Sequence, residues 1–280
     1  MEHKKTLKQN QLVSIISPVY NAHMYLEQCI RNVIEQTYPY IEHIIIDGGS
    51  TDGTLEIIEE YQKKYPDRIG FISEPDRGAG DAWNKGWKIA KGDIIGWIGA
   101  DDIYMPDAVE TIVSFFNENP DAYFVYGECE YIDGEGNITG KAKTREFNLH
   151  YALNNDNPIP TMSAFYRKEV IRKIGWMDTT INACDYDYWI RVAKQFPMHH
   201  IKKVLSRFRI HDGSVGGKLK TFKIYARERY IINRRHGGSL VSYHVLGYIL
   251  THYLPTFMVN TLIRSLWEFK KGRLFKRKSL

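Results

Sequence analysis

The chain has 280 residues, of which 43% are hydrophobic and 25% are charged, with a formal net charge of +5. This composition is that of a globular protein and suits one large α/β domain, or one domain with an appendage. Seven Lys or Arg residues and one Glu lie between Arg264 and Lys278, so this segment carries +6 and the rest of the chain −1. The main part of the chain therefore lacks the basic bias of a nucleic-acid-binding domain, and we expect no nucleic-acid partner.

The cysteines and the first residues of the chain indicate the cellular compartment in which the protein is expected. Cys29, Cys129 and Cys184 form no CxxC pair and are odd in number, which predicts reduced thiols rather than a disulfide framework. The first eleven residues are polar and basic, without the apolar segment of a secretory signal. We therefore expect a cytoplasmic protein.

Strand-like and helix-like segments alternate from residue 13 to about residue 127. Runs of apolar, largely β-branched residues predict strands at Val13–Val19, Ile44–Ile46, Phe71–Ile72, Ile94–Ile98 and Tyr123–Tyr126. Apolar periodicity predicts intervening helices around Leu26–Ile34, Leu55–Tyr65, Trp83–Ala90 and Val109–Phe116, the first of them capped by Asn21. This alternation predicts an α/β fold with a mostly parallel, Rossmann-like central sheet flanked by helices.

The alternation stops after Gly127. We expect a turn at residues 133–136, a loop at 154–160, a strand at 162–166 and a helix at 185–195. From about Lys220 the chain is expected to be helical.

Polar residues follow four of the predicted strands. They are Tyr20-Asn21, Asp47, Glu74-Pro75-Asp76 and Asp101-Asp102. Right-handed crossovers bring the carboxyl ends of parallel strands to one edge of the sheet, where ligands bind in such folds. The sequence therefore predicts a polar, mostly acidic ligand crevice at this edge.

Two adjacent carboxylates, Asp101 and Asp102, directly follow the fourth strand. Because like charges repel, such a pair needs a cation or hydrogen-bond donors. Oxygen ligands of this kind suit Mg²⁺ or Mn²⁺, which are commonly bound by one or two carboxylates and the phosphates of a substrate. The alternative is structural: Asp102 or Asp107 caps the next helix.

The segment Asp47–Thr54 is a glycine-rich turn between a strand and a helix. Such a turn lets the backbone approach a nucleotide, although a plain turn with Thr51 or Asp52 as helix cap remains the alternative. It is not a P-loop, because no Gly-Lys-Ser/Thr occurs in it. Gly78-Ala79-Gly80 is not a dinucleotide fingerprint either, since Trp83 replaces the third glycine.

Several motifs occur together in order. They are Ile15-Ile16-Ser17-Pro18-Val19-Tyr20-Asn21, Asp47-Gly48-Gly49-Ser50-Thr51-Asp52-Gly53-Thr54, Asn84-Lys85-Gly86, Ala90-Lys91-Gly92-Asp93 and Ala100-Asp101-Asp102. This set closely resembles family 2 glycosyltransferases, from about Val13 to His211. The resemblance implies a GT-A fold and an inverting transfer from a nucleotide-sugar donor.

The resemblance assigns roles in donor binding. Pro18, Tyr20 and Asn21 match the segment that lines the base pocket, and Glu27 matches an acid that often helps to hold the nucleoside. Asp47 matches the carboxylate that accepts the N3–H of a base, which implies uracil or thymine. Asp101 matches the residue nearest the ribose, and Asp102 matches the metal ligand that bridges to the diphosphate.

The third motif departs from the family pattern. Many relatives have Ala-Arg-Asn where this chain has Ala82-Trp83-Asn84, preceded by Asp81. The resemblance still places Asn84 at the donor site, with Asp81 near the ribose or sugar and Arg77 facing the diphosphate. A solvated loop is the alternative for Arg77.

The segment Cys184–Arg191 matches an acidic motif that precedes a helix in the family. The resemblance makes Asp185 the base that accepts the proton of the acceptor hydroxyl, with Asp187 as the alternative base or a helix cap. Cys184 stands where Glu is common, so an assisting acid is missing. The later segment Arg207–Ser214 resembles an Arg-x-His motif, in which His211 is a metal ligand or contacts the diphosphate.

The C-terminal part has a different character. Ser239 to Ile263 contains no Asp, Glu, Lys or Arg and is followed by the basic run. It contains polar residues that make a poor transmembrane helix, so the alternatives are interfacial helices on an anionic membrane or a helical cap on the domain.

We therefore expect a glycosyltransferase domain at residues 10–218 and a helical, basic extension at 219–280. The expected reaction transfers a sugar from a nucleotide-sugar to a glycan or lipid-linked acceptor in surface polysaccharide synthesis, with a UDP-sugar as the expected donor and dTDP- and GDP-sugars as the alternatives. It would use Mn²⁺ or Mg²⁺, at the inner face of the cell membrane. The alternatives are a nucleotidyltransferase that makes nucleotide sugars, for which residues 17–21 lack a catalytic basic residue, and a non-catalytic nucleotide-sugar-binding protein.

Overall fold

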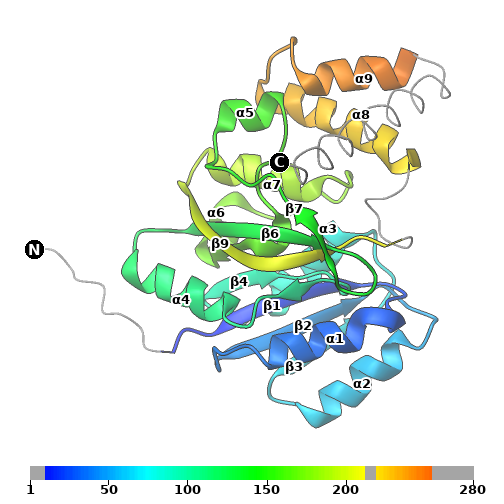
Figure 1. Cartoon of the computed structure of the whole chain (residues 1–280), viewed down its shortest axis with the longest axis vertical. Helices are drawn as coiled ribbons and strands as arrows, with labels where there is room; N and C mark the ends of the chain where they lie inside the picture. The colour runs from blue at the N-terminus through cyan, green and yellow to red at the C-terminus, as the bar shows by residue number, and fades with distance from the viewer. Residues whose placement is uncertain (1–9, 212–218, 254–280) are drawn as a thin grey trace, which may run out of the picture. The chain divides into compact units, whose positions relative to one another are not determined.

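The computed structural model describes residues 10–211 and 219–253. The described residues fall into two units, residues 10–152 with 157–211, and residues 153–156 with 219–253. The expected boundary at residue 218 lies outside the described residues. The first unit contains the central sheet (Figure 1).

One half of the sheet is parallel and corresponds to the predicted βαβ units. Its strands are β1 (Val13–Val19), β2 (Ile41–Asp47), β3 (Ile69–Ser73) and β4 (Ile94–Trp97), in the order β3-β2-β1-β4. The register places Val19 beside Asp47 and Asp47 beside Ser73, so the carboxyl ends of β1, β2 and β3 are level. The predicted mostly parallel sheet is confirmed.

The other half of the sheet is mixed. The order continues β4-β8-β6-β9-β5, and β7 pairs with the last residues of β6 outside this order. These strands are β5 (Ile103–Tyr104), β6 (Phe124–Ile132), β7 (Ile138–Lys141), β8 (Ala164–Arg167) and β9 (Met198–Arg209). β8 is antiparallel to both neighbours, whereas β6 and β9 are parallel to each other. β9 therefore brings Arg209 and His211 to the same edge as the ends of β1 and β4.

The helices follow the strands in chain order. In the first unit they are α1 (His23–Ile34), α2 (Thr54–Lys64), α3 (Ala79–Ile89), α4 (Ala108–Glu118), α6 (Glu169–Ile174) and α7 (Cys184–Ala193). The short helix α5 (Leu149–Asn154) crosses from the first unit into the second, and a 3₁₀ turn, η1 (Thr161–Ser163), precedes β8. The prediction that Asn21 caps α1 is wrong, because the helix follows Ala22 without a side-chain cap.

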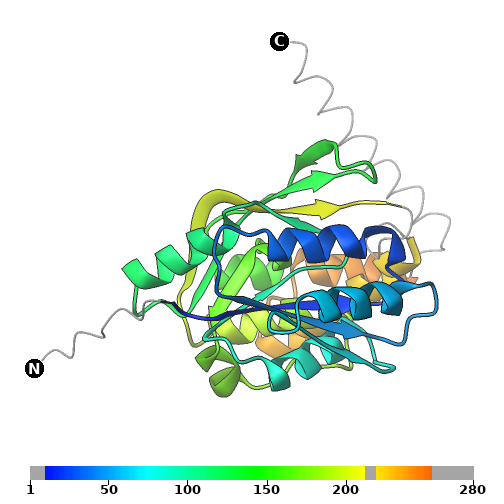
Figure 2. The ribbon, with the colours of Figure 1, turned by 90° about the horizontal axis from the view of Figure 1, so that it is seen from below.

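Helices cover both faces of the sheet, as the view from below shows (Figure 2). On one face, α1, α2 and α4 bury side chains that include Ile15, Leu26, Ile58 and Val109. On the other, α3, α6 and α7 bury an aromatic cluster around Ile16. Successive side chains of β1 thus point to opposite faces of the sheet, as the pleat of a strand requires.

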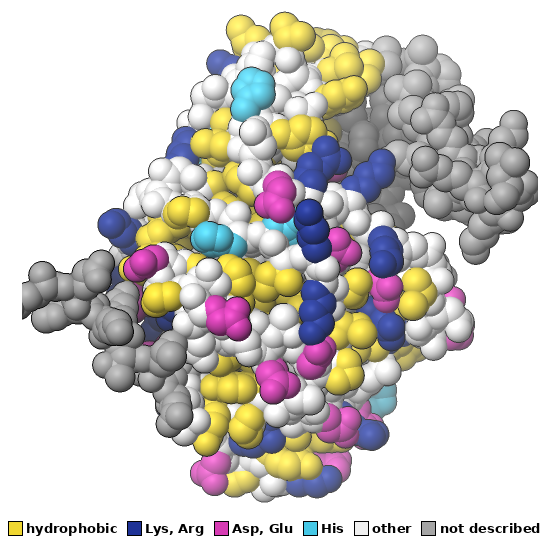
Figure 3. Space-filling view, turned by 60° about the vertical axis from the view of Figure 1, so that its left-hand side comes forward, with side chains coloured by type: hydrophobic (Ala, Val, Ile, Leu, Met, Phe, Trp, Pro, Cys, Tyr) yellow, Lys and Arg dark blue, Asp and Glu magenta, His cyan; other side chains and the backbone are white. Residues whose placement is uncertain are grey.

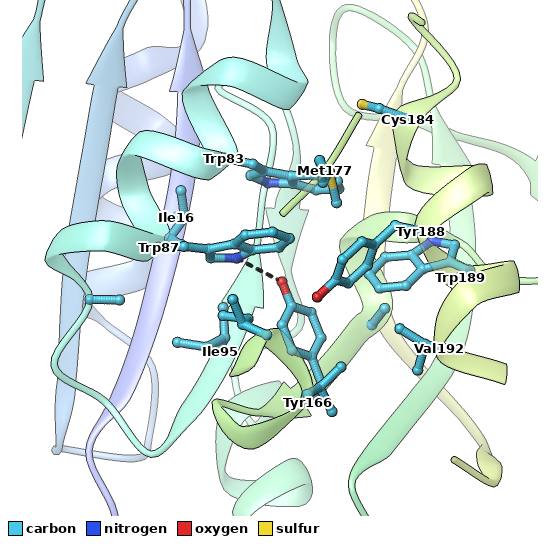
Figure 4. Close-up of a cluster of buried hydrophobic side chains, with 14 of the residues drawn as sticks. Ile16, Trp83, Trp87, Ile95, Tyr166, Met177, Cys184, Tyr188, Trp189 and Val192 are labelled. Carbon is cyan, nitrogen blue, oxygen red and sulfur yellow. Dashed lines mark hydrogen bonds between the residues drawn. The ribbon is translucent and has the colours of Figure 1, made fainter. Parts of the chain in front are cut away.

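The aromatic cluster fixes α3 and α7 against the sheet. Trp83 and Trp87 of α3 pack with Tyr188 and Trp189 of α7, and the indole of Trp87 donates to the hydroxyl of Tyr166 at 3.0 Å (Figure 4). The four aromatic side chains are at most 3% exposed. Because each large aromatic side chain buries 150–250 Å², about 600 Å² or more of surface orients these two helices.

The second unit contains α8 (Leu219–His236) and α9 (Tyr243–Tyr253). The two helices pack together through the stacked rings of Tyr230 and Tyr248, 4.3 Å apart. No helix of the described residues is long and apolar enough to span a membrane. The basic run expected to contact lipid lies outside the described residues.

All three cysteines are buried free thiols. This agrees with the expectation of reduced cysteines. Burial raises the pKa of the thiols of Cys29 and Cys129, which makes them poor nucleophiles.

Candidate donor and metal site

The loops after β1 and β2 are joined by the side chain of Asn21. The side-chain carbonyl oxygen of Asn21 accepts a hydrogen bond from the backbone N–H of Thr51 at 2.9 Å, and the backbone N–H of Asn21 donates to the Ser50 hydroxyl at 2.8 Å. Asn21 has a positive φ of 47°, a conformation that Asn tolerates better than most residues. The neighbouring Tyr20 is 67% exposed, so its ring is accessible to a planar ligand, while Pro18 is half-buried in β1.

Asp47 is fully buried at the end of β2 and organises the glycine-rich turn. Its carboxylate accepts hydrogen bonds from the N–H groups of Gly49 and Ser50, at 3.2 Å, and from the hydroxyls of Ser50 and Ser73, at 2.5 and 2.7 Å. A carboxylate has about four acceptor positions, so a base that donated to Asp47 would have to share or replace one of these donors. The Ser73 hydroxyl, which can rotate, is the simplest donor to displace.

The loop after β3 lies against the glycine-rich turn. A side chain at Gly48 would place its Cβ 2.9 Å from the Asp76 carboxylate. Beyond it, the guanidinium of Arg77, 72% exposed, pairs with Asp81 at 3.2 Å. Partial burial opposes ionisation of Asp81, but the hydrogen bonds and charge of Arg77 outweigh it and lower the pKa of Asp81. Arg77 and Asp81 thus form one charged pair at the start of α3.

Asp101 and Asp102 follow β4, and His211 follows β9, at the same edge of the sheet. The imidazole Nε2 of His211 lies 3.0 Å from a carboxylate oxygen of Asp101. Asp102 is only 2% exposed, and its carboxylate accepts the backbone N–H of Arg209 at 3.0 Å. Burial, and then repulsion from Asp101, raise the pKa of Asp102 well above its ordinary value.

Arg209 connects this acidic site to the elements around it. Its guanidinium donates to the carbonyl of Asp101 at 2.9 Å, to the carbonyls of Asp133 and Gly134 at 3.1 and 3.0 Å, and to the Gln28 side chain at 2.8 Å. The side chain is 2% exposed and stacks on the ring of Tyr25, 4.6 Å from its centroid. Arg209 therefore fixes the positions of the β4 loop, the β6–β7 turn and α1 relative to one another.

Two residues expected at the donor site have other contacts in the structure. The carboxylate of Glu27 accepts the hydroxyl of Tyr61 at 3.0 Å, which joins α1 to α2. The amide of Asn84 makes two hydrogen bonds with the backbone of Met177, at 2.9 and 3.1 Å. Asn84 thus ties α3 to the segment that leads to α7.

The two candidate bases on α7 differ in their surroundings. Asp187 is 1% exposed and forms an ion pair with Arg191 at 2.9 Å, a helix-stabilising contact. Asp185 is half-buried, and its carboxylate accepts the Thr161 hydroxyl at 2.6 Å and the N–H of Tyr186 at 2.8 Å. The sulfur of Cys184 lies against Gly80 of α3, so a larger side chain at position 184 would crowd α3.

The residues at this edge fit a divalent cation in their chemistry. Carboxylate oxygens are ligands that Mn²⁺ and Mg²⁺ accept, with phosphate oxygens as the usual additional ligands, and an imidazole is a ligand for transition-metal ions. Within residues 10–211 and 219–253, no three acidic, His or Cys side chains form a complete metal site by themselves. A cation here would therefore need ligands from the donor as well as from the protein.

Sequence reasoning assigned no role to Arg209 or Thr161. Arg209 lay inside the Arg-x-His motif, which was the only indication of its importance. Thr161 lay between the predicted loop at 154–160 and the predicted strand at 162–166, and its contact with Asp185 joins residues 24 positions apart.

Two solved structures with the same fold were determined with a nucleotide-sugar bound. A mannosyltransferase from Pyrobaculum calidifontis, in complex with GDP-Man and Mn²⁺, superposes with a TM-score of 0.66 at 18% identity, over 95% of this chain and 83% of its own. TarS of S. aureus, in complex with UDP-GlcNAc, superposes with a TM-score of 0.59 at 16% identity, over 80% and 71%. The chain therefore has the GT-A fold.

The sequence comparisons give the family. The family model described as Glycosyl transferase family 2 matches residues 14–175, and this chain belongs to that family. An uncharacterized glycosyltransferase of Methanocaldococcus jannaschii is 30% identical over 271 residues, which cover 90% of this chain and 92% of that protein. Chondroitin synthase of Escherichia coli is 29% identical over 94% of this chain, but the match spans only 37% of that enzyme.

Proposed function

We propose that this protein transfers a sugar, with inversion, from a UDP-sugar to an acceptor hydroxyl, with a divalent cation at Asp102 and His211. The observation that carries the proposal is the pair Asp101 and Asp102 at the sheet edge, with His211 3.0 Å from Asp101 and the Asp102 carboxylate bonded to the N–H of Arg209, two residues before His211. A buried carboxylate beside a second carboxylate is costly for the free protein. A cation that bridges to a diphosphate would offset that cost.

The donor would lie along the ends of β1 to β4. Tyr20, with Pro18 and Asn21 behind it, would line the base pocket, and Asp47 would accept the N3–H of the base. Asp101 would contact the ribose, and Arg77 would approach the diphosphate after exchanging its partner Asp81. Glu27 and Asn84 would then act indirectly, by holding α1 and α3.

Asp102 and His211 would hold the cation. When bound, a divalent cation neutralises the charge that develops on a leaving diphosphate. The exposed guanidinium of Arg77 is a further positive group near the same loops.

Asp185 would act as the base in a single displacement. The acceptor oxygen attacks the anomeric carbon and transfers its proton to Asp185. The bond from that carbon to the diphosphate oxygen breaks, and the nucleoside diphosphate leaves with the electron pair. Attack from the side opposite the leaving group inverts the anomeric centre.

The setting would be polysaccharide synthesis on a glycan or lipid-linked acceptor, at the inner face of a cell membrane. Support comes from exposed apolar residues of the second unit: Leu240, Val241, Tyr243, Leu246 and Tyr253 are 50–92% exposed. Figure 3 shows hydrophobic side chains gathered at the top of the view, over α9. Co-sedimentation with anionic vesicles tests this: Leu246→Glu should weaken binding, and absence of binding by the unaltered protein would contradict it.

Calorimetry of UDP binding tests the donor site. UDP should bind in Mn²⁺ and much more weakly in chelator, because phosphates and the carboxylate pair repel each other without a cation. Equal affinity in both conditions would contradict the metal assignment. No binding in either would contradict the UDP assignment.

Substitutions of the two carboxylates of α7 distinguish the catalytic residue from the structural one. Asp185→Asn should lower turnover by ~10²-fold or more with UDP affinity retained. Asp187→Asn should instead cost about 3 kcal/mol of unfolding free energy, because it breaks a buried ion pair. The reverse result would make Asp187 the base.

A further inference from the structure

A short hydrogen bond joins Thr161 to the proposed catalytic base. Thr161 begins η1 and is 9% exposed, and its hydroxyl donates to one carboxylate oxygen of Asp185 at 2.6 Å. This length is typical of a hydroxyl that donates to an ionised carboxylate. Such charge-assisted hydrogen bonds are stronger than those between neutral groups. The contact therefore favours one orientation of the Asp185 side chain.

The turn that carries Thr161 is anchored to the sheet. Ser163, two residues later, is fully buried and contacts the Ser206 hydroxyl at 2.6 Å, and it donates to the carbonyl of Glu128 at 3.0 Å. The N–H of Ser163 also closes the turn on the carbonyl of Pro160 at 2.9 Å. Because β6 and β9 hold Ser163, the position of the Thr161 hydroxyl is set by the sheet.

The helix that carries Asp185 is anchored separately. Tyr188, Trp189 and Val192 of α7 point into the aromatic cluster (Figure 4) and are at most 1% exposed. The second carboxylate oxygen of Asp185 accepts the N–H of Tyr186 at 2.8 Å. Two donors on different oxygens, each held by a packed element, fix the rotation of the carboxylate.

From this geometry we infer that Thr161 is a positioning residue, which orients the Asp185 carboxylate toward the acceptor hydroxyl. It acts through Asp185 and does not contact the reacting atoms. The inference rests on the proposed role of Asp185 as base. An error of ~1 Å in the position of a catalytic group can cost ~10²-fold in rate, so a hydroxyl that only positions Asp185 can affect turnover.

Two substitutions of Thr161 test the inference. Thr161→Val keeps the branched shape and removes the donor, whereas Thr161→Ser keeps the donor and removes a methyl group. Thr111→Val is the matched control: Thr111 is a half-buried threonine of α4, on the opposite face of the sheet, whose hydroxyl donates to the Asp107 carbonyl at 2.7 Å. Asp185→Asn is measured alongside them.

The assay is hydrolysis of UDP-glucose, UDP-galactose and their N-acetylated counterparts in Mn²⁺, where water replaces the acceptor, with UDP affinity and thermal unfolding measured in parallel. Thr161→Val should lower kcat by about 10-fold or more, leave UDP affinity unchanged, and be rescued by Thr161→Ser to within about 3-fold of the unaltered protein. Thr111→Val should leave kcat unchanged.

Two results would overturn the inference, and a third would overturn its premise. If Asp185→Asn abolishes turnover but Thr161→Val does not lower kcat, positioning by Thr161 is wrong. If both Thr161 variants lower kcat and UDP affinity together, the role of Thr161 is structural. If Asp185→Asn retains turnover, the proposed base itself is wrong.

Discussion

Asp102→Asn should stabilise the protein in the absence of metal. Asp102 is 2% exposed, and burial and repulsion from Asp101 raise its pKa. For an acid whose pKa is raised by folding, the unfolding free energy falls as pH rises from its ordinary value through the folded value. At neutral pH the folded protein therefore carries a penalty, which asparagine removes at nearly constant shape.

The size of the effect follows from the burial of the group. Replacing a buried ion pair by apolar residues of similar volume is neutral or gains about 1–4 kcal/mol; here one charge is removed and the bond from the Arg209 N–H can be kept, so we expect a gain at the low end, about 1 kcal/mol. That corresponds to a rise of roughly 3 °C in Tm for a chain of this length. The difference should shrink at low pH, where Asp102 becomes protonated.

Mn²⁺ and UDP should reverse the order of stability of the unaltered protein and Asp102→Asn. At about 100 times its dissociation constant, a ligand stabilises the folded state by ~2.7 kcal/mol. The unaltered protein should gain this stabilisation free energy from Mn²⁺ with UDP, whereas Asp102→Asn should gain little of it. The unaltered protein would then be the more stable of the two.

Thermal unfolding in chelator, and in Mn²⁺ with UDP, measures both effects. Asp107→Asn is the control, because it removes one charge from a half-exposed position paired with Lys203. The reasoning is refuted if Asp102→Asn is less stable than the unaltered protein in chelator at neutral pH. Equal shifts of both proteins in Mn²⁺ and UDP would refute the metal assignment.

Three further substitutions or conditions test the packing around the site. Arg209→Lys cannot reproduce the four guanidinium hydrogen bonds, so urea unfolding should show a loss of about 3 kcal/mol, with weaker UDP binding in Mn²⁺. Gly86→Ala would place a Cβ 2.6 Å from a methyl of Ile16 and should cost about 1–3 kcal/mol, part of which Ile16→Val should recover. Burial, and then the charge of Arg68, lower the pKa of His43 from 6.5 to about 3, so stability should decline as pH falls through this window, by up to about 1.4 kcal/mol per pH unit. His43→Gln should show a flatter pH profile, and an unchanged profile would contradict the burial of His43.

The parallel half of the fold was predictable because its strands are short runs of Ile and Val. The isoleucines of β1, β2 and β4 face helices on both sides, so the apolar pattern and the secondary structure coincide. By contrast, β9 was missed. Six of its twelve residues are His, Lys or Arg, so its sequence lacks the alternation of a half-buried strand.

The site was predictable to the extent that it follows strands in the sequence. Asp101 and Asp102 follow β4 directly, and motif order led to His211, although contact between Asp101 and His211 spans 110 positions. The role of Arg209 depends on contacts with α1, the β4 loop and the β6–β7 turn. Such a role cannot be read from local pattern, because a buried arginine and a solvated one look alike in sequence.

The central claim is that the acidic edge of the sheet binds a nucleotide-sugar through a metal and activates it for transfer. The most direct measurement is turnover of a panel of UDP-sugars by the full chain, in Mn²⁺ and in chelator. The account predicts that at least one UDP-sugar is hydrolysed slowly in Mn²⁺, releasing UDP, and that chelator or Asp102→Asn abolishes this turnover. Turnover that persists in chelator, or a chain that binds UDP-sugars in Mn²⁺ without ever releasing UDP, would contradict it.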